Sequence, residues 1–159
     1  MKKILLIGGE GYIGNIISEY LFSIGYGVTS FDNFMYENNL CALNHTHNSN
    51  YTFIKGDMAN SLLLKEIIGR HDAVVLLAGL VGDPITKSYP KESTLINDNA
   101  VQNVINICKN RIERFIFVST CSNYGLISDG TTADEGHELT PLSLYAKSKV
   151  NAEKLILSL

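Results

Sequence analysis

Two kinds of hydrophobic pattern alternate along the chain. Short segments that predict strands lie at residues 4–7, 27–31, 51–55, 73–77 and 115–118. Apolar residues at helical spacing predict helices between them, at residues 12–24, 61–68 and 93–109, and again from about residue 141. Strands that alternate with helices favour a parallel sheet joined by right-handed crossovers. The pattern therefore predicts an α/β fold, with a doubly wound parallel sheet and helices on both faces.

The first predicted helix carries an apolar stripe that we expect to pack on the sheet. The stripe consists of Ile13, Ile16, Ile17, Tyr20, Leu21 and Ile24. Gly25 follows the last of these residues and is expected to end the helix, as glycine commonly does.

Residues 33–50 are polar, rich in asparagine and without a period, so we expect a long irregular connection there. Cys41, His45 and His47 lie within it and could suggest a metal site. Because no second group of ligands has a matching spacing, we expect no metal to be bound.

Composition narrows the class of protein. At 159 residues, 45% of them hydrophobic and 18% charged, the chain is long enough to bury the core of one globular domain. A net charge of −3 gives no basic surface for nucleic acid, which we therefore do not expect as a partner. No apolar run is long enough to cross a membrane, and three cysteines, an odd number, favour free thiols in a reducing compartment. We expect a cytoplasmic protein without a membrane partner.

A glycine-rich turn directly follows the first predicted strand. Gly8, Gly11 and Gly14 form a G-x-x-G-x-x-G pattern that leads into the first helix. Glycines there permit a tight turn and a close approach of the backbone to a pyrophosphate, which the N-terminus of the helix attracts. Asp32 ends the second predicted strand, where dinucleotide-binding folds place the acidic residue that holds the adenosine ribose. The spacing indicates a Rossmann-type dinucleotide site.

Two features near the C-terminus carry candidate chemistry. Tyr145 and Lys149 are spaced to share one helix face, where the ammonium group can favour the tyrosine phenolate and make it a general base. Thr120 lies in a Ser/Thr-rich turn at the carboxyl end of the strand at 115–118, where ligands of open α/β sheets bind. Taken singly, each feature also fits an ordinary surface pair or turn. Together with the glycine turn they point to one crevice.

With these motifs, the chain from Lys3 to Leu155 resembles the N-terminal half of an extended short-chain dehydrogenase/reductase, in the NAD-dependent epimerase/dehydratase family that acts on nucleotide sugars. The resemblance implies NAD as cofactor. Its implied ligands are Gly8, Gly11, Tyr12, Ile13, Gly14, Asp32, Asn33, Asp57, Met58, Leu77, Ala78, Gly79, Asn97, Tyr145 and Lys149. The implied catalytic residues are Thr120, which bonds the reacting oxygen, Tyr145, which takes the sugar hydroxyl proton, and Lys149, which holds the ribose and lowers the Tyr145 pKa.

The chain departs from the family pattern at two places. Leu76 replaces the usual histidine and Gly79 an alanine, which alters the cofactor pocket without touching proton transfer. Cys121 and Ser122 replace the Asp-Glu pair with which the family's dehydratases carry out elimination. We therefore expect an epimerase that acts on a nucleotide sugar, with a UDP-sugar as its substrate. A dehydratase, a keto-sugar reductase and a non-catalytic NAD-binding protein are the alternatives.

The last helical pattern reaches Leu159 without a residue that ends a helix. We therefore expect residues 1–159 to be an incomplete NAD-binding domain, truncated at the C-terminus and lacking a substrate domain. Such a chain is expected to bind NAD weakly, to show little catalysis and to self-associate through uncovered apolar surface. In the full-length form we expect a homodimer.

Overall fold

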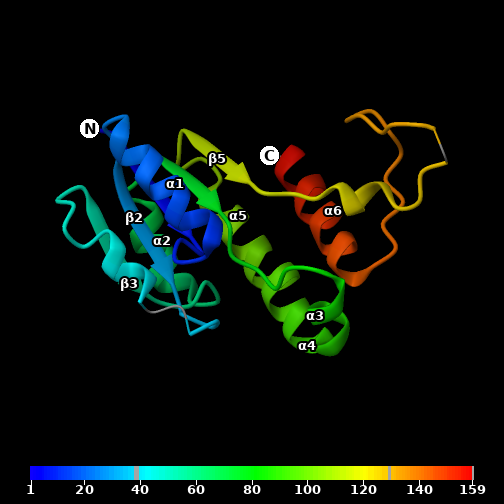
Figure 1. Ribbon diagram of the computed structural model, residues 1–159, viewed down its shortest axis with the longest axis horizontal. Coiled ribbons are helices and arrows are strands. Elements are labelled where there is room, and N and C mark those ends of the chain that lie inside the picture. Colours follow the sequence, from blue (N-terminus) through cyan, green and yellow to red (C-terminus); the bar gives the residue numbers. More distant parts are fainter. Residues whose placement is uncertain (38–39, 129, 159) are drawn as a thin grey trace. The chain divides into compact units, whose positions relative to one another are not determined.

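The computed structural model describes residues 1–37, 40–128 and 130–158, in which five parallel strands alternate with helices (Figure 1). The strands are β1 (Lys3–Ile7), β2 (Gly27–Asp32), β3 (Tyr51–Lys55), β4 (Ala73–Leu76) and β5 (Arg114–Phe117). The α-helices are α1 (Tyr12–Ser23), α2 (Ser61–Ile68), α3 (Asp83–Ser88), α4 (Pro90–Ser93), α5 (Val101–Cys108) and α6 (Leu144–Leu157). Two 3₁₀ helices, η1 (Cys41–Asn44) and η3 (Cys121–Tyr124), and a π-helix, η2 (Thr94–Ala100), complete the set.

The chain divides into two compact units. Unit 1 comprises Met1–Ala78 and Asn106–Val118, and contains the whole sheet. Unit 2 comprises Gly79–Ile105 and Ser119–Leu159, and is helical apart from its loops.

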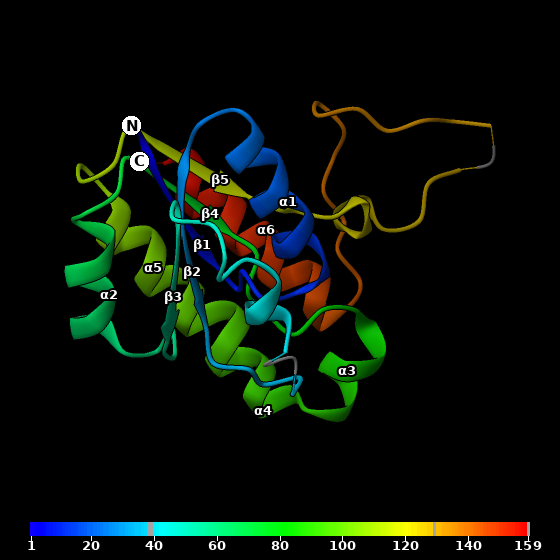
Figure 2. The same cartoon turned by 60° about the vertical axis from the view of Figure 1, so that its left-hand side comes forward.

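The sheet of unit 1 has the strand order β3-β2-β1-β4-β5, with every neighbouring pair parallel. The chain moves one way across the sheet from β1 to β2 and the other way from β3 to β4, so right-handed crossovers put α1 and α2 on opposite faces. Figure 2 shows these two helices on either side of the strands. The predicted doubly wound parallel sheet is thus confirmed.

Both faces of the central strands are buried. On one face, Ile4, Leu6, Val28 and Val75 form a cluster against which Ile17 of α1 packs, with other partly buried side chains. Because side chains alternate along a strand, Leu5 and Ile7 point to the other face, and they are 0% and 1% exposed. Burial on both sides explains the nearly continuous apolar runs of β1 and β4.

The apolar stripe expected on α1 is wrong for four of its six residues. Ile13, Ile16, Tyr20 and Ile24 are 47%, 55%, 64% and 49% exposed, respectively. The buried residues of this helix are Gly14 and Ser18, and the Ser18 hydroxyl donates to the Gly14 carbonyl. A Cβ atom on Gly14 would lie 2.2 Å from the Gly9 carbonyl oxygen, so the helix approaches the preceding turn too closely for a larger residue on that side.

Several boundaries also differ from the expected ones. The predicted helices leave out residues 83–88, but these residues form α3, which begins after Gly82 at φ +96. Helical structure then runs from α4 through η2 to α5, in place of one helix at 93–109. The last helix begins after Ser143, whose side chain accepts the Ala146 N–H, rather than near Pro141.

The connection at 33–50 contains η1, and residues 38–39 lie outside the described part of the chain. His45 is 4% exposed, and its ring packs edge-on against Phe22 and Tyr51, with centroid distances of 5.6 Å and 5.4 Å. Within residues 1–37, 40–128 and 130–158 no group of three or more metal-ligating side chains is found. His45 is therefore an aromatic component of the core, in contrast to the exposed His47.

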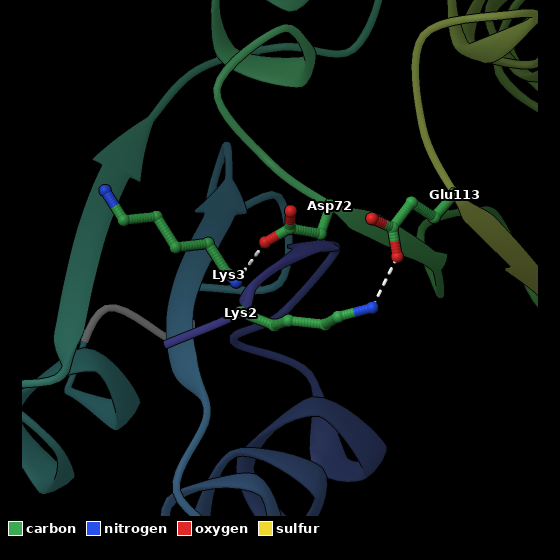
Figure 3. Close-up of polar contacts among 4 residues, drawn as sticks. All are labelled: Lys2, Lys3, Asp72 and Glu113. Carbon is green, nitrogen blue, oxygen red and sulfur yellow. Dashed lines mark hydrogen bonds and ion pairs between the residues drawn. The ribbon is translucent and has the colours of Figure 1, made fainter.

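The amino-terminal ends of three strands are joined by polar contacts (Figure 3). Lys2 forms an ion pair with Glu113, and the backbone N–H of Lys3 donates to Asp72 Oδ2 at 2.6 Å. The Lys2 and Glu113 side chains are 58% and 63% exposed, so their pairing contributes little to stability. None of the helices in the described residues is long and apolar enough to cross a membrane.

The partly buried His71 of unit 1 should make the stability of the fold depend on pH. Its Nδ1–H donates to the Ile67 carbonyl and its Nε2 accepts the Thr29 hydroxyl, both at 2.7 Å, so the neutral ring satisfies both partners. Burial lowers the pKa of His71 below its usual 6.5. The folded chain then binds fewer protons than the unfolded chain below pH 6.5, and the His71 contribution to stability is lost progressively as pH falls from 6.5 toward the lowered pKa.

We therefore expect the free energy of unfolding in urea to fall between pH 7.5 and pH 5.5, and to fall less in His71→Asn. The matched control is His47→Asn, since His47 is exposed. Equal pH dependence in the wild type and His71→Asn would contradict this account.

Candidate functional site

The glycine turn after β1 is shaped largely by the chain's own packing. Gly8 has φ +83, and its N–H donates to the Phe31 carbonyl at 2.8 Å. A Cβ atom on Gly8 would lie 2.5 Å from the Ala78 nitrogen. Neighbouring backbone thus requires Gly8 and Gly14 to be small. Gly8 lies against Ala78, which follows β4, and Gly14 lies against the Gly9 carbonyl of the same turn.

Gly11 differs from the other two glycines. Its φ of −71 suits any residue, and a Cβ atom there would meet only the Gly8 carbonyl oxygen, at an ordinary 3.4 Å. No described neighbour therefore requires glycine at this position, which leaves the backbone open to a group from outside the chain. The first turn of α1 holds no acidic side chain, and Gly11 offers no side-chain cap. These features fit a pyrophosphate, whose charge the helix N-terminus favours.

Asp32 lies at the carboxyl end of β2, with its carboxylate oriented by two backbone amides. Oδ2 accepts the Glu10 N–H at 3.1 Å and Oδ1 accepts the Phe34 N–H at 2.8 Å. An ionised carboxylate has further lone pairs on both oxygens, so Asp32 can still accept two hydroxyl groups of a ribose.

Two of the other expected cofactor ligands in unit 1 also lie together. Asn33 Nδ2 donates to Asp57 Oδ2 at 3.3 Å, so these side chains meet at the carboxyl ends of β2 and β3.

Other residues expected at the cofactor occupy different environments. Met58 is 7% exposed and belongs to the core. Leu77 and Ala78 follow β4, and both donate their N–H groups to the Ile7 carbonyl at 2.8 Å. Of the residues expected at the start of α1, Tyr12 is 85% exposed.

In unit 2, Asn97 holds the segment that follows β4. The Asn97 side chain is carried by the π-helix η2 and is 5% exposed. Its Oδ1 accepts the Leu80 N–H at 2.9 Å and its Nδ2 donates to the Leu80 carbonyl at 2.8 Å. A Cβ atom on Gly79 would lie 3.0 Å from Asn97 Oδ1. Asn97 therefore acts on the shape of this loop through its side chain, a role that the sequence did not indicate.

Thr120 lies at the start of η3. Its Oγ1 accepts the Ser122 N–H at 3.2 Å and donates to Ser122 Oγ at 3.3 Å. Asn123, which is 2% exposed, donates from Nδ2 to Ser119 Oγ at 3.1 Å and so supports the same turn. The Thr120 hydroxyl is thereby held by a short helical turn that packs on α6.

Tyr145 and Lys149 share one face of α6, as expected, with Lys149 Nζ 5.7 Å from the centre of the Tyr145 ring. Burial raises the pKa of Tyr145, and the charges of Asp83 and Cys121 raise it further. Burial lowers the pKa of Lys149 to about 8, although the Glu153 carboxylate acts in the opposite direction. The residues around Tyr145 thus favour the neutral phenol, in contrast to the expectation that Lys149 lowers its pKa.

Asp83 is a candidate that the sequence analysis missed. It is the first residue of α3, a helix that packs on α6 within unit 2, and its charge acts on Tyr145. The signal available in the sequence was the Gly-Asp-Pro run at 82–84, because proline in the first turn is typical of a helix start.

Comparison with known proteins places these features in a family. Residues 4–159 match the NAD dependent epimerase/dehydratase family. A dTDP-glucose 4,6-dehydratase from Actinoplanes sp. is 31% identical over 98% of this chain and 51% of its own length. A UDP-glucose 4-epimerase from Rhizobium meliloti is 28% identical over 98% of this chain and 46% of its own length.

A solved structure supports the same assignment. The UDP-glucuronic acid 4-epimerase of Bacillus cereus, in complex with UDP-glucuronic acid and NAD, has a TM-score of 0.86 and 28% identity over 96% of this chain and 50% of its own. The chain spans about half the length of the curated relatives it matches. Family match, sheet topology and glycine turn agree, and the chain belongs to the NAD-dependent epimerase/dehydratase family.

Proposed function

We propose that this chain forms the NAD-binding part of a nucleotide-sugar epimerase that oxidises and re-reduces a sugar hydroxyl carbon. The observation that carries the proposal is the Tyr145–Lys149 pair, a buried phenol with an amine over its ring. A protein that only sensed or stored NAD would need the glycine turn and Asp32, but not this pair. As its substrate we propose a UDP-sugar.

The cofactor part of the proposal depends on residues of unit 1. Gly11 leaves its backbone open to the pyrophosphate, and Asp32 accepts the adenosine ribose hydroxyls. The negative charge of Asp32 repels a 2′-phosphate, so NAD is preferred over NADP. Asn33 and Asp57 border the same strand ends and contribute polar contacts to the adenosine half.

The proton step belongs to residues of unit 2. Tyr145 accepts the proton of the sugar hydroxyl, and Thr120 bonds the same oxygen by exchanging its long contact with Ser122. When bound, NAD⁺ supplies the hydride acceptor and a positive charge that favours the phenolate. This added charge is needed because burial, Asp83 and Cys121 raise the pKa of Tyr145.

A dehydratase is the second candidate, and Asp83 is the observation that favours it. Elimination needs a proton acceptor and a proton donor near the sugar, and Cys121 and Ser122 supply these poorly. The charge of the Asp83 carboxylate acts on Tyr145, so Asp83 could serve as one of the two proton-transfer groups that elimination needs. Incubation with UDP-, dTDP- and GDP-sugars distinguishes the candidates, because an epimerase retains the sugar's oxygen count whereas a dehydratase releases water. A keto-sugar reductase would instead consume reduced cofactor.

Tyr145→Phe tests the catalytic assignment. Loss of the proton acceptor should reduce kcat on the active UDP-sugar by about 10²- to 10⁴-fold. NAD affinity, measured by calorimetry, should stay within about twofold because the phenyl ring preserves the packing. Tyr20→Phe, at a tyrosine that is 64% exposed, is the control and should leave both quantities unchanged. Full activity in Tyr145→Phe would refute the assignment.

Gly11→Ala and Gly14→Ala test the phosphate site as a pair. Gly11→Ala should keep the free energy of unfolding within about 0.5 kcal/mol, since its new methyl meets only an ordinary 3.4 Å contact. It should nevertheless weaken NAD binding by about tenfold or more, because the methyl occupies the path of the pyrophosphate.

Gly14→Ala should instead lower the free energy of unfolding by about 1–3 kcal/mol, because its methyl overlaps the Gly9 carbonyl. Urea denaturation and NAD titration of both variants measure these effects. Unaltered NAD binding in Gly11→Ala would show that the turn does not hold a pyrophosphate.

Lys149 should titrate near pH 8 in the protein without added nucleotide. Reductive methylation with ¹³C-formaldehyde gives an NMR signal for this amine, assigned by its absence in Lys149→Arg. Glu153→Gln should move the midpoint to lower pH, because the Glu153 carboxylate raises the pKa of Lys149. A midpoint near the usual 10.5 would contradict the burial of this amine.

A further inference from the structure

The glycine turn contains a buried acidic residue. Glu10 lies between Gly9 and Gly11 and is 1% exposed, although a carboxylate is costly to bury unless it is hydrogen-bonded. The Tyr51 hydroxyl donates to Glu10 Oε1 at 2.5 Å. Tyr51 is the first residue of β3, and β3 is separated from β1 by β2 in the sheet. This bond therefore links the turn after β1 to a strand two positions away.

Tyr51 is itself held in place. Its ring packs edge-on against Phe22 and His45, with centroid distances of 6.0 Å and 5.4 Å. Burial raises the pKa of Tyr51, as do the bond to Glu10 and its charge. The hydroxyl group thus stays protonated near neutral pH and remains the donor in the contact with Glu10.

The backbone of Glu10 reaches the ribose-binding carboxylate and the first helix. Its N–H donates to Asp32 Oδ2 at 3.1 Å, and its carbonyl accepts the Asn15 side chain at 3.2 Å. Asp32 Oδ1 accepts a hydrogen bond from the backbone N–H of Phe34, which follows β2. One of the two backbone bonds that orient Asp32 thus comes from a residue whose own side chain is held by Tyr51.

We propose that Glu10, held by Tyr51, is a positioning residue that orients Asp32 and thereby sets the preference for NAD over NADP. The inference rests on the dinucleotide site proposed above. Asp32 discriminates against a 2′-phosphate only while its charge is held where that phosphate would lie. If the Tyr51 bond is lost, the Glu10 amide shifts and Asp32 loses one of its two backbone donors. Asp32 can then turn aside and admit NADP.

The ratio of the dissociation constants for NADP⁺ and NAD⁺, measured by calorimetry on the full chain, tests this proposal. Tyr51→Phe removes the donor and should lower the ratio by about tenfold, as expected for the loss of one hydrogen bond to a charged group. Glu10→Asp keeps the charge but cannot reach Tyr51, and should lower the ratio similarly. Tyr26→Phe removes the hydroxyl of another partly buried tyrosine in unit 1 and should leave the ratio unchanged.

Glu10→Gln separates positioning from direct repulsion. The amide oxygen can still accept the Tyr51 hydroxyl, so the ratio should stay close to that of the wild type. A fall in Glu10→Gln as large as in Glu10→Asp would overturn the proposal, because the charge itself would then act on the 2′-phosphate. General destabilisation of the fold weakens the binding of NAD⁺ and NADP⁺ alike, and so leaves the ratio of their dissociation constants unchanged.

Two further outcomes are distinguishable. If the wild-type chain binds NAD⁺ and the ratio is unchanged in both Tyr51→Phe and Glu10→Asp, this inference is overturned and the proposed function stays intact. Wild-type chain that binds neither nucleotide would overturn the proposed function and this inference with it. If Tyr51→Phe fails to fold, as judged by circular dichroism, Glu10→Asp decides the question.

Discussion

The close contact between the turn after β1 and the first helix is the constraint on which unit 1 depends. Gly14 sits against the Gly9 carbonyl and Gly8 against the Ala78 backbone, so neither position has space for a Cβ atom. This contact places the N-terminus of α1 at the carboxyl end of β1, and it turns Gly14 and Ser18 inward together with only part of the apolar stripe. The chain's own packing requires glycine at these two positions, whereas no described neighbour requires it at Gly11.

Side-chain and backbone groups around this turn hold the neighbouring loops by hydrogen bonds. Asp32 accepts two backbone amides, and Glu10 is bonded through its side chain, its amide and its carbonyl. In unit 2, Asn97 uses both ends of its amide on Leu80. Pre-ordered loops lower the entropy lost on binding, so such bonds support affinity without touching the ligand.

Burial and nearby charge in unit 2 act against ionisation of Tyr145. Burial and neighbouring negative charge raise the pKa of Tyr145, and burial lowers that of Lys149 to about 8. Tyr145 by itself therefore favours its neutral phenol form. A positively charged cofactor beside the phenol would favour its ionised form, so proton transfer in the proposed mechanism would depend on the bound cofactor.

The sequence by itself determined the alternation of strands and helices, the glycine turn and the pairing of Tyr145 with Lys149 on one helix face. These features depend on local periodicity and spacing, which a folded chain must respect. Periodicity predicts that α1 has an apolar stripe, but the close approach at Gly14 decided which face packs inward. Likewise, composition could not show that His45 fills the core beside Phe22, because that contact joins α1 to a distant connection.

Only the tertiary structure decided the pKa shifts of Tyr145 and Lys149 and the side-chain contacts of Glu10. The Tyr145 pKa depends on Asp83 and Cys121, which are far from it in sequence and act through space. The bond between Tyr51 and Glu10 joins residues that are 41 positions apart, and it needs the strand order of the sheet to form. Burial and charge at a site are sums over neighbours brought together by folding, and no local pattern contains them.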